Sequence, residues 1–92
     1  MLEISYCPLK CGRNIAERGQ SFEAAREFEM DNALIAEDTR RAYPERRFQA
    51  LGYIDDRLHM LVFTPRKGKV HVISLRKANT REVRRYEQEK ND

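Results

Sequence analysis

The 92-residue sequence contains no tryptophan, only two cysteines, three prolines and four glycines, and it has no long apolar run. No apolar stretch approaches the ~20 residues that a helix needs to cross a bilayer, so we expect no membrane-spanning helix. The N-terminus carries the acidic Glu3 and no basic segment leading into an apolar one. It therefore does not read as a signal peptide, and we expect a cytoplasmic protein.

The two cysteines, Cys7 and Cys11, are spaced C-x3-C. Two thiolates cannot complete a four-ligand zinc site, and His59 and His71 belong to a different part of the pattern. The simpler interpretation is two reduced thiols near the start of a helix; an inter-subunit disulfide or a redox role is the alternative. The sequence also lacks a P-loop, a G-x-G-x-x-G motif, a G-x-S-x-G motif and a carboxylate cluster. We therefore predict neither a cofactor nor a metal site.

The chain is long enough for one domain, which we expect to span residues 1–92. Charged residues make up 36% of it and hydrophobic residues 40%, in periodic runs that favour a folded domain with a charged surface. Residues 1–39 carry four basic and eight acidic residues, whereas residues 40–85 carry thirteen basic and four acidic residues. This asymmetry is typical of a protein that binds a polyanion or an acidic protein partner.

Hydrophobic spacing predicts the order β-α-α-β-β-β-β-α. Alternating or short apolar runs predict strands over residues 2–6, 33–36, 47–54, 58–64 and 70–75. Helical spacing predicts helices over residues 10–18, 22–28 and 79–87, the last with a capping box formed by Asn79 and Glu82. Short links between the later strands predict an antiparallel meander, and we expect an α+β fold with the helices on one face of the sheet.

Strand alternation predicts which polar side chains lie together. Arg47 alternates with Phe48, and Ser74 and Arg76 alternate with Ile73 and Leu75. If Phe48 and Ile73 face the helices, Arg47 and Arg76 project from the uncovered face. Strand pairing would then bring the two guanidiniums together, with Glu45 beside them, as a clamp for phosphate. The alternative is a solvated face with ordinary ion pairs.

Two further groups of residues have a functional and a plain structural interpretation. Either histidine has a side chain suited to acid–base chemistry, but the same alternation places His71 on the core face with Ile73 and Leu75. The segment from Asn79 to Glu87 exposes three arginines that form either a polyanion-binding surface or a charged, solubilising one: Arg81, Arg84 and Arg85.

An ordered set of short motifs resembles the BrnT family of bacterial toxins over residues 6–87. The set comprises Tyr6-x-Pro8-x-Lys10, Gly19-x-Ser21-Phe22-Glu23, Glu37-Asp38, Glu45-x-Arg47-Phe48, Leu61-Val62-Phe63-Thr64, Val72-Ile73-Ser74-x-Arg76-Lys77-Ala78, Arg81-Glu82 and Arg84-x-Tyr86-Glu87. The family usually has Trp-Asp where this chain has Tyr6-Cys7, and Lys-His where it has Glu17-Arg18.

The resemblance implies a RelE-like fold and a metal-independent ribonuclease toxin of a type II toxin–antitoxin system. It further implies a BrnA-like ribbon-helix-helix antitoxin, a toxin homodimer within a heterotetramer, and operator DNA bound only through the antitoxin.

On that basis we expect Arg47 and Arg76 to hold the scissile phosphate, with Glu45 as the base and Lys77 as a weaker electrostatic contributor or proton donor. Arg81, Arg84 and Arg85 would contact the flanking RNA phosphates. Two other functions stay open at this point: a non-catalytic module that binds an antitoxin, and a simple nucleic-acid-binding protein.

Overall fold

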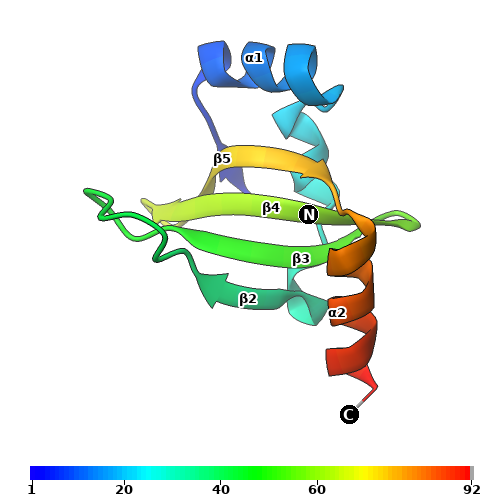
Figure 1. The fold of residues 1–92 in the computed structure, drawn as a ribbon. Coiled ribbons are helices and arrows are strands. Elements are labelled where there is room, and N and C mark those ends of the chain that lie inside the picture. Colours follow the sequence, from blue (N-terminus) through cyan, green and yellow to red (C-terminus); the bar gives the residue numbers. More distant parts are fainter. Residues whose placement is uncertain (92) are drawn as a thin grey trace.

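A computed structural model describes residues 1–91, in which five strands form one sheet in the order β1-β5-β4-β3-β2 (Figure 1). The strands are β1 (Ile4–Ser5), β2 (Leu34–Glu37), β3 (Phe48–Ile54), β4 (Arg57–Arg66) and β5 (Lys69–Lys77). Strands β2 to β5 form the predicted antiparallel meander. The first predicted strand joins the sheet beside β5 in parallel orientation, so the sheet is mixed. A purely antiparallel sheet was therefore the wrong prediction: the segment after β1 carries the chain to the far edge, and the meander returns with β5 parallel to β1.

Two α-helices, α1 (Pro8–Arg18) and α2 (Thr80–Lys90), and two 3₁₀ helices, η1 (Phe22–Glu27) and η2 (Met30–Asn32), accompany the sheet. The predicted second helix is η1, with the tighter 3₁₀ winding. Its apolar residues Phe22, Ala25 and Phe28 recur every third position, which is the period of a 3₁₀ helix. None of the helices in residues 1–91 combines the length and apolar character that crossing a membrane requires.

Helices cover both faces of the sheet, which contradicts the expectation that they lie on one. On one face, Phe22 and Phe28 pack with Ala50, Leu61 and other buried residues of the strands. On the other face, Leu51, Leu58 and Met60 pack with Ala78 and Tyr86, which bring α2 onto that face. Because Ala50 and Leu51 are adjacent in β3, their side chains point to opposite faces. In Figure 1, α2 lies at the end of the sheet opposite the long loop that joins β2 to β3.

A buried asparagine attaches α1 to the edge of the sheet. The Asn14 Nδ2 group donates to the Leu75 carbonyl (2.8 Å) and to the Gln20 carbonyl (2.8 Å). β1 pairs only with Val70 and His71, so it stops before it reaches Leu75. The Asn14 side chain thus satisfies a carbonyl at the edge of β5 that would otherwise be buried without a partner.

A β-bulge in β5 changes which residues face the core. Val62 pairs with Ser74 and Phe63 pairs with Val72, so Ile73 is an extra residue with no partner on β4. Val72 and Leu75 are buried in the core, whereas Ile73 lies beside Ser74 on the opposite face. The prediction that Ile73 and His71 share the core face with Leu75 is wrong, because regular alternation is interrupted at the bulge.

Gly52 lies under the ring of Phe28, and its size limits how closely η1 and β3 approach. A Cβ at Gly52 would come within 2.6 Å of Phe28 Cζ and 3.1 Å of Ala33 Cβ.

We predict that Gly52→Ala lowers the free energy of unfolding by about 1–3 kcal/mol through overpacking, measured by urea denaturation. The control is Gly12→Ala, in the interior of α1, where an added Cβ meets nothing within 4 Å and should stabilise by about 0.5–1 kcal/mol. Equal effects of the two substitutions would contradict this packing.

Candidate functional site

A cleft of about 430 Å³ opens on the sheet face that α2 partly covers. Its walls come from α1, the segment after β2, strands β3 to β5 and the first turn of α2. The lining contains four arginines, two carboxylates, two uncharged polar residues and three apolar residues: Arg18, Arg40, Arg47, Arg76, Asp38, Glu82, Gln49, Ser74, Met60, Val62 and Ile73. The structure thus brings Arg47 and Arg76 into one cleft, as strand alternation predicted.

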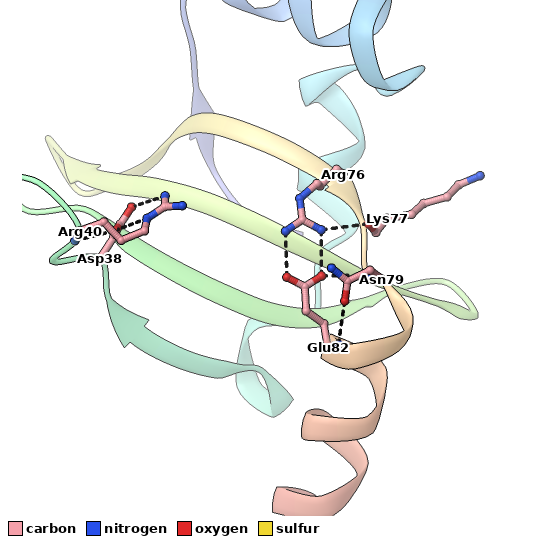
Figure 2. Close-up of polar contacts among 6 residues, drawn as sticks. All are labelled: Asp38, Arg40, Arg76, Lys77, Asn79 and Glu82. Atoms are coloured by element: carbon pink, nitrogen blue, oxygen red, sulfur yellow. Dashed lines mark hydrogen bonds and ion pairs between the residues drawn. The ribbon is translucent and has the colours of Figure 1, made fainter.

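Arg76 is held by Glu82 through two parallel hydrogen bonds of 2.8 Å (Figure 2). The same carboxylate accepts a hydrogen bond from the backbone of Asn79, whose side chain in turn caps α2. The hydrogen bonds from Arg76 lower the pKa of the Glu82 carboxyl, with a smaller contribution in the same direction from the Asn79 backbone. The capping box that the sequence predicted therefore also fixes the Arg76 guanidinium in the cleft.

A second ion pair lies on the other side of the open sheet face (Figure 2). Asp38 accepts two hydrogen bonds of 2.8 Å from the Arg40 guanidinium, and its carboxylate is almost completely buried. These bonds are the main reason that the pKa of Asp38 falls from its ordinary 3.8 to about 2. Asp38 therefore stays ionised at neutral pH and orders the loop between β2 and β3.

Arg47 differs from Arg76 because no carboxylate of residues 1–91 forms an ion pair with it. Its guanidinium stacks on the ring of Tyr43, with 4.1 Å between the Arg47 Cζ and the ring centroid. Its Nε is buried and has no hydrogen-bond partner among residues 1–91. Leaving such a donor unsatisfied costs free energy, and this kind of exception is often found at functional sites.

Arg18, Arg40 and Gln49 line the cleft but were not among the predicted site residues. Strand alternation could have identified Gln49 of β3, which lies two positions after Arg47. Arg18 ends α1, and only the docking of that helix on the edge of β5 brings it near Ser74. A smaller hollow of about 250 Å³ shares Arg18, Ile73 and Ser74 with the cleft and adds Lys10 and Arg13 of α1 to the basic surface.

Two predicted catalytic residues lie outside the cleft. Glu45 pairs with Arg66 at the far end of β4, and Arg66 in turn contacts His71. Glu45 shares a separate surface hollow with Arg47 but does not line the cleft that contains Arg76. Its loop position carried no strand register that could fix where it points. Lys77 follows Arg76 in β5 and points away from the Arg76 guanidinium (Figure 2), as alternation along a strand requires.

The histidines also lie away from the cleft. His71 accepts or donates a hydrogen bond with Ser5 Oγ (2.9 Å), and burial is the main cause of its lowered pKa, with a smaller effect from Arg66. His59 is buried and bonds to the Arg57 carbonyl and the Gln20 amide; burial again lowers its pKa. These contacts account for both side chains structurally.

Arg81, Arg84 and Arg85 lie together on an exposed surface of α2 that is separate from the cleft. The apolar residues of this segment, Val83 and Tyr86, pack against the sheet, and the three arginines are exposed to solvent. Residues 1–91 therefore contain a recessed basic region around Arg47 and Arg76 and an open one on α2.

Comparison with known proteins decides the family. Residues 6–82 match the family described as the ribonuclease toxin, BrnT, of type II toxin–antitoxin systems. The chain belongs to the BrnT family. Members of this family are ribonuclease toxins of type II systems, in which a toxin is paired with an antitoxin. The resemblance that the sequence motifs carried is confirmed, including most of the range over which they occur.

The fold has a counterpart among solved structures. The 1.1 Å crystal structure of the Brucella abortus ribonuclease toxin BrnT matches with a TM-score of 0.66 and 21% sequence identity. The match covers 87% of this chain and all of the Brucella chain. At this identity the match shows that the mixed α+β fold is shared with BrnT. Curated protein sequences gave no match to the chain.

The buried Asp38 carboxylate makes stability depend on pH. A carboxyl whose pKa is lower in the folded than in the unfolded protein stabilises the fold above its unfolded pKa, and the contribution is lost as the pH falls through the folded pKa. We therefore predict that part of the stability disappears between about pH 4 and pH 2. Asp38→Asn should lower the free energy of unfolding at pH 7 by about 1–3 kcal/mol, because the buried side chain loses its charge-assisted hydrogen bonds from Arg40, and should lack that acid-dependent part.

The matched control for Asp38→Asn is Glu37→Gln, at the neighbouring position. The Glu37 carboxylate is 39% exposed and pairs with Arg46, which is 72% exposed. Such surface pairs contribute between about 0 and 1 kcal/mol, so the control should keep the acid transition of the parent. Chemical denaturation at several pH values measures both variants. An Asp38→Asn protein with the parent's pH profile would show that Asp38 is not the titrating group.

Proposed function

We propose that this BrnT-family chain is a metal-independent endoribonuclease that inhibits translation and growth, and that the cleft holds the scissile phosphodiester of its RNA substrate. The supporting observation is the convergence of Arg47 and Arg76 from separate strands on one cleft, with Arg18 and Arg40 on its walls. Arginine is well suited to this task because its planar guanidinium binds two phosphate oxygens at once.

In the proposed reaction the RNA 2′-hydroxyl attacks the adjacent phosphorus, the bond to the 5′ oxygen breaks, and a 2′,3′-cyclic phosphate forms. The negative charge that builds up on the phosphoryl oxygens is stabilised by Arg47 and Arg76. Asp38 and Glu82 are poor bases, because ion pairs with arginine lower the pKa of both carboxyls. We therefore assign the rate enhancement mainly to fixed positive charge, with the 2′-hydroxyl proton passing to solvent and the leaving oxygen taking a proton from it.

The two ion pairs of the cleft have separate parts in this proposal. Glu82 holds the Arg76 guanidinium in place before substrate binds, and this lowers the entropy that Arg76 loses on contacting a phosphate. Arg47 retains an uncompensated charge and is the stronger attractor for the phosphate. Glu45 and Lys77 have no part in the reaction, because neither lines the cleft.

We further propose that the antitoxin is a BrnA-like ribbon-helix-helix protein. In this proposal two toxin chains join the antitoxin in a heterotetramer, which contacts operator DNA only through the antitoxin. The family supports an antitoxin partner in general terms. The exposed arginines of α2 are available for RNA when the antitoxin is absent.

One observation favours a second function, a non-catalytic module that binds an antitoxin. Two of the four arginines in the cleft, Arg40 and Arg76, are already neutralised by Asp38 and Glu82. This leaves Arg18 and Arg47 as the uncompensated charges of the lining among residues 1–91. An assay of RNA cleavage distinguishes a non-catalytic, antitoxin-binding function from ribonuclease activity.

The first prediction from this proposal concerns the two central arginines. We expect Arg47→Ala and Arg76→Ala to lower the rate of RNA cleavage roughly ten- to a thousand-fold, because each removes about 2–4 kcal/mol of transition-state stabilisation. Cleavage of an oligoribonucleotide in the presence of a chelator measures this effect. Arg57→Ala, at an exposed position at the start of β4, is the matched control and should cleave at the parent rate.

Thermal unfolding of each variant distinguishes lost chemistry from lost structure, since Arg76→Ala also leaves Glu82 without its ion pair. Arg76→Lys keeps the charge but loses the two parallel bonds, and should retain a folded protein with intermediate activity. If a folded Arg47→Ala protein cleaves RNA as fast as the parent, the assignment of Arg47 is wrong. A parent protein that binds an antitoxin but cleaves nothing supports the module instead.

A second prediction concerns Arg81, Arg84 and Arg85, the arginines of the exposed α2 surface. Replacing all three with alanine should weaken RNA binding for every sequence alike and reduce the slope of log K against log salt by about two. The slope falls by about 0.7 for each lost contact to a single-strand phosphate. Filter binding at several salt concentrations measures it, and an unchanged slope would mean that RNA does not contact this surface.

A further inference from the structure

The cleft contains features that binding a phosphate does not require. Beside its arginines, the lining contains the half-buried apolar side chains of Val62 and Ile73, next to Met60, which is buried against Ala78 and Tyr86. A site built only for phosphate would need donors and positive charge, and apolar surface beside them gains nothing from an anion. The apolar part therefore indicates a ligand that has a flat apolar face next to its phosphate.

The β-bulge is what brings Ile73 to this position. Without the bulge, successive residues of β5 would alternate between the two faces of the sheet, and Ile73 would lie on the face opposite to Ser74. Ile73 instead lies half-buried at the point where the cleft and the smaller hollow along α1 meet. Bulges are over-represented beside active sites, where they re-aim a side chain.

Two uncharged polar side chains, Gln49 and Ser74, adjoin this apolar part of the cleft. Both are half-buried, and neither takes part in the bonds that fix the flanking Arg76 and Arg40. A glutamine amide offers one donor and one acceptor side by side, which matches the N6 and N7 groups of adenine. A hydroxyl donates or accepts as the ligand requires.

We infer that the cleft contains a nucleobase subsite, in which a base next to the scissile phosphate lies on Ile73 and Val62 and presents its edge to Gln49 and Ser74. The base that fits the Gln49 amide best is adenine. This inference rests on the proposed ribonuclease function and adds the substrate class that the site selects. A volume of about 430 Å³ is in the range of pockets that bind small molecules and is adequate for one nucleotide.

Base recognition of this kind follows from how single-stranded RNA is bound. Its unstacked bases are held against flat or apolar side chains and read through hydrogen bonds on their edges. Phosphate contacts, by comparison, position the chain and carry no sequence information. Arg47 and Arg76 would therefore set the affinity and the chemistry, while Gln49 would set the base at which cleavage occurs.

The test compares cleavage of four oligoribonucleotides that differ in one base by the parent, Gln49→Leu and Ile73→Ser. The parent should prefer adenine by about five- to a hundred-fold over the other bases. Gln49→Leu should reduce this preference to within about two-fold, chiefly by slowing cleavage of the adenine substrate. Ile73→Ser should raise KM for all four substrates alike, since it removes contact area and not an edge contact.

The matched control is Gln20→Leu, which makes the same chemical change outside the cleft, where the amide contacts His59. It should keep the parent's base preference. A parent that cleaves all four substrates equally, or a Gln49→Leu protein that keeps the parent's preference, overturns the subsite and leaves the ribonuclease proposal standing.

If the parent cleaves no RNA, the ribonuclease proposal fails, and binding of adenosine 5′-monophosphate tests the subsite separately. In that case NMR spectra should show shifts of the Gln49 side-chain amide and the Ile73 methyl groups with adenosine 5′-monophosphate. Ribose 5-phosphate, which has the same phosphate and no base, should not shift them. Equal shifts with both ligands, or none with either, overturn the subsite.

Discussion

The bond between Asn14 and the edge of β5 is the contact on which the site depends. Strand β1 covers only the beginning of β5, so the Leu75 carbonyl needs a partner from elsewhere, and the Asn14 amide supplies it. The same amide holds the Gln20 carbonyl and so fixes the turn that follows α1. With α1 attached in this way, Arg18 at its last position reaches the cleft. One wall of the basic cleft is therefore positioned by a neutral side chain.

The sequence predicted the strands of the meander, both α-helices and the capping box, because periodicity and local capping are properties of neighbouring residues. Strand alternation also predicted that the side chains of Arg47 and Arg76 lie on one face of the sheet, and both line the cleft. Alternation failed at Ile73, where the bulge is a property of the pairing between β4 and β5. It could not place Glu45, which belongs to a loop, or Arg18, whose position depends on the docking of α1.

Paired and unpaired arginines divide the electrostatic roles within the cleft. Arg40 and Arg76 hold carboxylates, and their bonds give the walls a fixed shape at the cost of part of the positive charge. Arg47 is held by an aromatic ring, which restricts the guanidinium and leaves its charge uncompensated. Stacking on Tyr43 thus restricts the guanidinium of Arg47, as the carboxylates restrict those of Arg40 and Arg76, but it does not neutralise the charge of Arg47.

Glu82 belongs at once to the first turn of α2 and to the wall of the cleft. Any local unfolding of this turn breaks the capping box and removes the carboxylate from Arg76 in the same event. Hydrogen exchange of the first amides of α2 and the fraction of molecules with an ordered Arg76 would then report one equilibrium. The free energy needed to unfold the first turn of α2 therefore sets an upper limit on the fraction of molecules in which Arg76 is positioned to bind substrate.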